Sequence, residues 1–134
     1  MLPVTADTVR VFLHLLGATV WVGGQLTLAG LVPGLRAVSE DAPRAVARRF
    51  AWVAWPAFGL LVVTGLWNLV AIDVTQTTTR YQVTLAVKLV VVALSGVSAA
   101  AHSGVSSRAA LAVWGAVSGA TALGALWLGV MLSP

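Results

Sequence analysis

Four long runs of apolar residues alternate with short polar stretches along the chain. The runs cover residues 9–32, 50–72, 81–101 and 109–132. Each is long enough for an α-helix to cross a bilayer, which takes about 20 apolar residues. Because the connections are short, consecutive helices should be antiparallel neighbours. The pattern therefore predicts an all-α integral membrane protein, a four-helix up-down-up-down bundle that forms a single transmembrane domain over residues 1–134.

The composition supports this assignment and narrows the chemistry. Hydrophobic residues make up 59% of the chain and charged residues 9%, whereas a soluble domain has about 25% charged residues. The chain has no cysteine, which excludes disulfides and thiolate metal sites. We find no nucleic-acid-binding module and no hydrolase, P-loop, dinucleotide or zinc signature. We therefore interpret the net charge of +4 as a signal of membrane orientation.

The polar stretch over residues 33–49 is the most charged part of the chain. It holds four arginines and two acidic residues. We expect Pro33 and Gly34 to end the first helix, and the rest to form a basic cytoplasmic loop with a short interfacial helix. Arg108 follows the third run. By the positive-inside rule both basic connections should face the cytoplasm, which places both chain termini outside.

The first apolar run carries one histidine on an otherwise apolar helix. His14 is followed at helical spacing by Trp21 and Gly24, so the three residues share one helix face. A polar group at membrane depth is costly unless it is paired or functional. His14 is therefore the first candidate ligand, and Trp21 and Gly24 are candidate pocket residues.

Other polar residues fall near the same depth. With a rise of about 1.5 Å per residue, His14 and Lys88 should both lie roughly 10 Å below the outer surface. Thr64, Trp67 and Asn68 of the second run should lie near this level. The alternative for Lys88 is that its side chain reaches the outer headgroups, and the alternative for His14 is a purely structural hydrogen bond.

A second stripe lies on the third run, where Lys88, Ser95 and His102 are spaced by seven residues. His102 should lie at the inner end, roughly 20 Å from Lys88, and is either a second site or an ordinary interfacial residue. Gly115 and Gly119 form a GxxxG spacing that permits close helix contact inside the bundle or across a homodimer.

The segment HLLGATVWVGG, which starts at His14, resembles the first helix of the copper resistance D (CopD) family of bacterial inner-membrane proteins. RRF at residues 48–50, TGLWN at residues 64–68 and the position of Lys88 are also similar. The same superfamily resembles the HemJ-type protoporphyrinogen oxidases, which are four-helix haem b proteins. The resemblance implies a multi-pass protein of the bacterial cytoplasmic membrane that handles either copper or haem b, with His14 as ligand and Lys88 as its companion.

The sequence departs from this pattern in two ways. Longer copper resistance D proteins have additional helices and a periplasmic domain, whereas this chain holds only the four-helix core. Its two methionines, Met1 and Met131, give little capacity for tight Cu(I) binding, which favours soft ligands. For haem, the second axial ligand would be Lys88, Met131 or a residue of a partner.

Three functional hypotheses remain at this point. The protein binds or transports copper through His14, or it is a haem b redox protein, or it is a cofactor-free structural or assembly subunit. In the first two, Trp21 and Trp67 would shape the pocket, and Thr64 or Asn68 would orient the imidazole. Lys88 would act as a deprotonated ligand or hold an anion such as a haem propionate. A periplasmic metal or electron partner is then expected.

Overall fold

The structure is a computed structural model that describes residues 3–133. Within these residues it contains helices and short connections and no β-strand. The chain divides into two compact units, one ending at Asp73 and the other beginning at Val74. Each unit is described by itself below.

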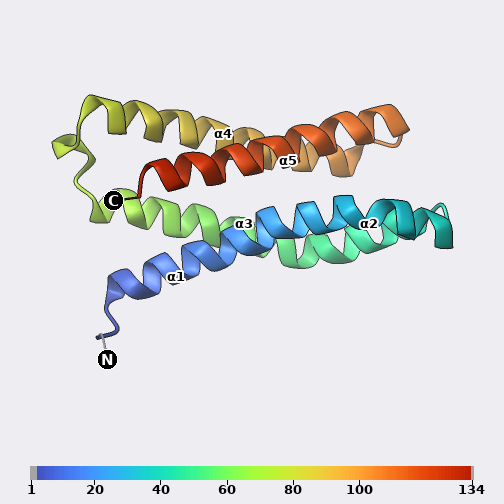
Figure 1. The fold of residues 1–134 in the computed structure, drawn as a ribbon, viewed down its shortest axis with the longest axis horizontal. Helices are drawn as coiled ribbons and strands as arrows, with labels where there is room; N and C mark the ends of the chain where they lie inside the picture. The colour runs from blue at the N-terminus through green and yellow to red at the C-terminus, as the bar shows by residue number, and fades with distance from the viewer. Residues whose placement is uncertain (1–2, 134) are drawn as a thin grey trace. The chain divides into compact units, whose positions relative to one another are not determined.

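The first unit is a helical hairpin with one long arm. Helix α1 (Ala6–Ala18) continues through the π-helical turn η1 (Thr19–Gly23) into α2 (Gly24–Val38). Helix α3 (Ala42–Ala71) then runs back along this arm and contacts α1, η1 and α2. In Figure 1 the blue-to-cyan arm and the green α3 lie side by side.

Helix α1 begins with a reciprocal cap. The Thr5 hydroxyl accepts a hydrogen bond from the Thr8 backbone N–H at 3.2 Å, and the Thr8 hydroxyl accepts one from the Thr5 N–H at 3.4 Å. This capping box satisfies two backbone donors that a helix start otherwise leaves unpaired. Thr5 is thus the N-cap of α1.

Most of the stretch over residues 33–49 is helical, so the prediction that Pro33 and Gly34 end the first helix is wrong. Helix α2 continues through Pro33 to Val38, and α3 begins at Ala42 with Pro43 in its first turn. Proline is well suited to a first helical turn because its missing N–H is unpaired there anyway. A proline inside a membrane helix is tolerated where its surroundings satisfy the freed carbonyl.

The second unit is a simple helical hairpin. After the 3₁₀ turn η2 (Val74–Gln76), α4 (Thr79–Gly104) and α5 (Arg108–Met131) pack along each other. Thr78 caps α4 and Ser107 caps α5, each through its side-chain oxygen. Helix α4 extends two to three residues beyond the predicted run at each end, whereas α5 starts and ends one residue earlier than its predicted run. Capping residues rather than the first apolar residue set where each helix begins.

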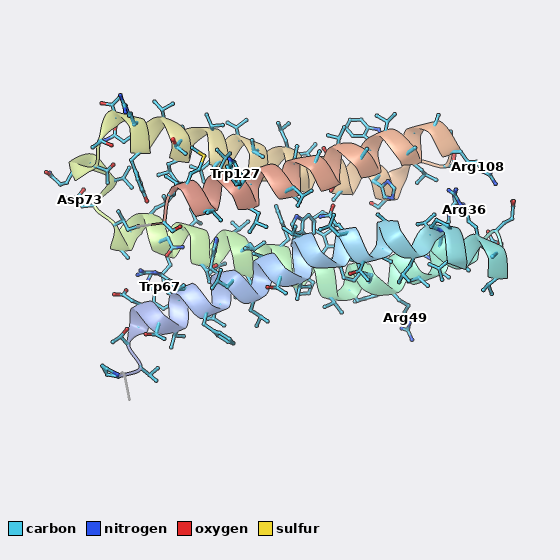
Figure 2. The ribbon with its side chains drawn as sticks, in the orientation of Figure 1. Arg36, Arg49, Trp67, Asp73, Arg108 and Trp127 are labelled. Atoms are coloured by element: carbon cyan, nitrogen blue, oxygen red, sulfur yellow. The ribbon has the colours of Figure 1, made fainter. Side chains whose placement is uncertain are left out.

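Four helical segments are long and apolar enough to cross a membrane: Ala6–Val38, Ala42–Ala71, Thr79–Gly104 and Arg108–Met131. They correspond one to one with the predicted runs, which confirms the all-α membrane fold class. In the first unit, Figure 2 shows Arg36 and Arg49 near the turn between α2 and α3, and Trp67 and Asp73 toward the opposite end of α3. The predicted orientation, with this basic turn in the cytoplasm and both chain termini outside, stays a prediction.

Candidate functional site

The candidate site in the first unit centres on a contact between α1 and α3. His14 Nδ1 lies 2.8 Å from the Thr64 hydroxyl oxygen. Thr64 is 1% exposed, and its hydroxyl also lies 2.7 Å from the Leu60 carbonyl oxygen of its own helix. Of the two residues expected to orient the imidazole, Thr64 therefore makes the hydrogen bond.

This geometry assigns the proton on His14. A hydroxyl has one proton, and the Leu60 carbonyl can only accept, so the Thr64 O–H donates to Leu60. The Thr64 oxygen must then accept from Nδ1–H of His14. In the neutral imidazole this leaves the lone pair on Nε2. Threonine thus fixes the tautomer in the way that outer-shell partners of metal-bound histidines do.

One glycine, Gly17, allows the helices to approach closely near His14, and a second, Gly65, faces the imidazole ring at ordinary van der Waals distance. A Cβ added at Gly17 would lie 2.9 Å from Leu61 Cγ and 3.0 Å from the Ala57 carbonyl oxygen. A Cβ at Gly65 would lie 3.7 Å from His14 Cε1. Gly17 is thus required for the backbone of α1 to lie against α3, which brings the imidazole within reach of the hydroxyl.

A buried arginine lies one helical turn before His14. Arg10 is 8% exposed, and its Nη1 forms an ion pair with Asp7 Oδ1 at 2.7 Å. The Nε of Arg10 is buried and has no hydrogen-bond partner among the described residues. Because residues four apart share a helix face, Arg10 belongs to the same face as His14.

An aromatic cluster follows the histidine along the first arm. Trp21, in the π-helical turn, is 4% exposed, and its ring centroid lies 4.5 Å from that of Phe58 and 5.6 Å from that of Trp55. The next predicted pocket residue, Gly24, faces Phe50, since a Cβ there would lie 2.0 Å from Phe50 Cζ. The packing around Trp21 and Gly24 therefore extends away from His14 and joins the arm to α3 by aromatic contacts.

The other two predicted pocket residues of α3 lie toward its end. Trp67 is 41% exposed, and Figure 2 shows it near the end of α3 that carries Asp73. Asn68 is partly buried and lies one turn beyond Thr64. Since His14 pairs with Thr64 and the helices are antiparallel, Asn68 lies at the level of Arg10. Arg10 and Asn68 therefore lie closer than His14 and Thr64 to the end of α3 that carries Asp73.

In the second unit the predicted stripe on α4 faces α5. A Cβ added at Gly129 would lie 3.2 Å from Lys88 Nζ, and one added at Gly115 would lie 3.2 Å from His102 Cε1. Between them, the Ser95 and Ser118 hydroxyls each donate to the other residue's backbone carbonyl at 3.4 Å.

Lys88 thus lies against Gly129, and His102 lies against Gly115. The two residues of each helix are fourteen positions apart. The seven-residue spacing of the sequence correctly indicated one shared face. Lys88 belongs to this second unit and His14 to the first, and their pairing as ligand and companion stays a prediction.

His102 has a defined hydrogen bond at the other end of the hairpin. Its Nδ1 lies 2.9 Å from the Leu111 carbonyl oxygen, which can only accept, so Nδ1 carries the proton here too. Gly115 makes room for the ring, whereas a Cβ added at Gly119 would meet no atom of the described residues within 4 Å. Gly115 therefore has a role within this unit, and only Gly119 of the GxxxG pair stays open for the predicted homodimer.

The described residues offer few ligands for one metal ion. Among residues 3–133, no group of three histidine, aspartate or glutamate side chains is arranged to hold a metal. Each histidine can supply one imidazole nitrogen, and the four acidic residues lie outside the apolar runs. A metal ion at His14 would thus have one imidazole ligand from this face and would need further ligands from elsewhere.

Sequence reasoning missed Arg10, Gly17, Gly65 and the π-helical turn. The first could have been found, because Arg10 precedes His14 by one helical turn and the same periodicity had placed Trp21 on that face. Gly17 and Gly65 give no distinct signal in a chain with thirteen glycines, since their role depends on which helix packs against them. The position of the π-helical turn has no residue signature that we recognise.

Comparison with known proteins gives one match. The model of the family described as copper resistance protein D matches residues 44–132, about two thirds of the chain, while no curated protein and no solved structure matches it. The matched segment contains Thr64, Asn68, Lys88 and His102, and His14 lies before it. Four apolar helices and this match make the chain a copper-related, multi-pass membrane protein, and it belongs to the copper resistance protein D family.

Proposed function

We propose that this protein binds copper transiently at Nε2 of His14 and passes it across or along the membrane. The observation that carries the proposal is the hydrogen bond from His14 Nδ1 to the Thr64 oxygen. With the proton on Nδ1, the lone pair of the neutral imidazole lies on Nε2, and Nε2 is the atom that would coordinate a metal ion. Membership of the copper resistance protein D family supports copper as the cargo.

The sparse ligand set supports passage rather than storage. Among the described residues, no group of three histidine, aspartate or glutamate side chains could hold a metal, and a single imidazole binds copper weakly, because tight copper sites combine several ligands. A transport site must release its ion as well as bind it, so weak binding suits conduction. Trp21 and its aromatic neighbours would keep the arm beyond His14 apolar. Lys88 would take part as a second ligand or as a cation that holds an anion.

The test is copper binding by the purified full-length chain in detergent. An absorption spectrum and metal analysis of the native sample come first, followed by copper titration against a competing chelator. We expect His14→Ala to abolish binding and Thr64→Val, which keeps the shape but removes the hydroxyl, to weaken it by about 10- to 100-fold. His102→Ala is the matched control, because it removes the other imidazole of the chain, and it should leave this binding unchanged.

Three results would contradict the proposal. Copper affinity that is the same in His14→Ala and wild type would exclude His14 as ligand. A Soret band in the native sample that disappears in His14→Ala would make this a haem protein instead. A sample that binds neither copper nor haem would support the structural-subunit hypothesis, with His14→Ala then lowering only stability.

A further inference from the structure

The guanidinium of Arg10 has an unusual environment for a residue so near a helix start. An arginine at this position of a membrane helix commonly extends into the headgroups. Arg10 instead is 8% exposed and belongs to the face of α1 that contacts α3, since His14 and Gly17 of that face both meet α3 residues. The guanidinium of Arg10 is therefore buried within the protein and does not extend into the solvent or the headgroups.

The ion-pair partner of Arg10 engages only part of the guanidinium. Asp7 Oδ1 contacts Nη1 at 2.7 Å, and Asp7 is 74% exposed. The side-on edge formed by Nε and Nη2 is the one that binds a carboxylate or phosphate through two parallel hydrogen bonds. The Nε of this edge is buried and has no acceptor among the described residues. A buried charged donor without an acceptor is costly, so this edge favours binding of an oxyanion.

We propose that Arg10 binds the oxygens of a phosphate group through its Nε edge, at the end of α1 that begins at Ala6. Asn68, at the same level on α3, is placed to add an amide N–H donor. Asp7 contacts Nη1 outside this edge, and its negative charge weakens the attraction of the guanidinium for a second anion. This site is separate from copper binding at His14 and does not depend on it.

Helix length favours a lipid headgroup as the source of that phosphate. The arm from Ala6 to Val38 has 33 residues, which at about 1.5 Å per residue is roughly 50 Å. The apolar core of a bilayer is only about 30 Å thick. The first turns of α1 should therefore lie among headgroup phosphates, although free inorganic phosphate has the same chemistry.

The experiment measures two probes on the detergent-purified full chain without copper. Inorganic phosphate is followed by ³¹P NMR line broadening, and phosphatidylglycerol is followed by native mass spectrometry. We expect Arg10→Gln to weaken binding at least tenfold and Arg10→Lys to recover only part of it, because lysine lacks the fork. Arg80→Gln is the matched control, since Arg80 is an exposed arginine near the start of α4, and it should bind as wild type does.

A second variant keeps the proposal testable if Arg10→Gln does not fold. Asp7→Asn removes the neighbouring negative charge and should tighten binding several-fold, which a purely structural ion pair would not do. Binding of both probes through Arg10 supports a shared phosphate site, and Arg10-dependent binding of one probe alone identifies its source. Binding of both probes that is unchanged in Arg10→Gln, or weakened in Asp7→Asn, overturns the proposal.

Discussion

The contact between Gly24 and Phe50 gives the sharpest test of how the first arm packs on α3. In Gly24→Ala the new methyl group would lie 2.0 Å from Phe50 Cζ and 2.5 Å from Cε2, whereas ordinary carbon contacts are about 3.5–4.0 Å. Either the ring or the helix must move by well over 1 Å. Overpacking of this kind costs about 1–3 kcal/mol, and we expect that loss in the free energy of unfolding.

The neighbouring glycine is a matched control. A Cβ added at Gly23 has no atom within 4 Å in the described residues, so Gly23→Ala should leave stability nearly unchanged or raise it slightly. The measurement is unfolding of the purified chain in mixed micelles with increasing SDS, followed by circular dichroism. Phe50→Ala added to Gly24→Ala should recover much of the loss, and a double-mutant cycle would give the coupling between the two positions.

Equal free energies of unfolding for Gly24→Ala and Gly23→Ala would refute the close contact between Gly24 and Phe50. The contact would also be refuted if the losses in Gly24→Ala and Phe50→Ala were additive in the double variant, because two residues in steric conflict must be coupled. Either result would mean that the arm does not approach α3 at Phe50 as the structure has it.

Further predictions concern the second unit and use the same unfolding assay unless stated. Ser95→Ala and Ser118→Ala should each cost about 0.6 kcal/mol, the average measured for side-chain hydrogen bonds between membrane helices, because each serine donates to a carbonyl of the other helix. A loss above about 2 kcal/mol for either variant would show a different role. Gly115→Ala should displace the His102 ring and shift its ¹⁵N imidazole resonances, whereas Gly119→Ala should not, and equal shifts would contradict the close contact at Gly115. Gly129→Ala should cost little, since Lys88 Nζ is the mobile end of a long side chain, and a strongly destabilised variant would show that Lys88 is rigidly held.

The sequence predicted the helices better than it predicted their ends. Hydropathy alone identified all four spans, because the bilayer sets a minimum length of apolar chain. It could not locate the end of α2, since Pro33 marks a probable boundary in soluble proteins but not in membrane helices. The helix start at Ala42 was missed for a related reason: charged residues suggested a loop, although arginine and alanine are both good helix formers.

In the candidate site, too, the sequence predicted relations within one helix but not contacts between two helices. Helical periodicity correctly put Lys88, Ser95 and His102 on one face of α4, because that relation lies within a single helix. Which residue of α3 meets His14 depends on the register between two helices, and the sequence left Thr64 and Asn68 as equal alternatives. The hydrogen bond to Thr64 resolves this choice. The register in turn places Asn68 at the level of Arg10, a relation that no pattern within either helix indicates.

The π-helical turn at Thr19–Gly23 accommodates one residue more than a regular helical turn would. It lies between two contacts with α3, the hydrogen bond of His14 and the close approach of Gly24. A π-helical turn holds about one residue more than an α-helical turn, so if these residues formed regular α-helix instead, everything after them would rotate by about 100° relative to His14. Only one of the two contacts could then persist. Deletion of one residue here should therefore restore regular α-helix with both contacts kept, whereas insertion of one residue should break one of them.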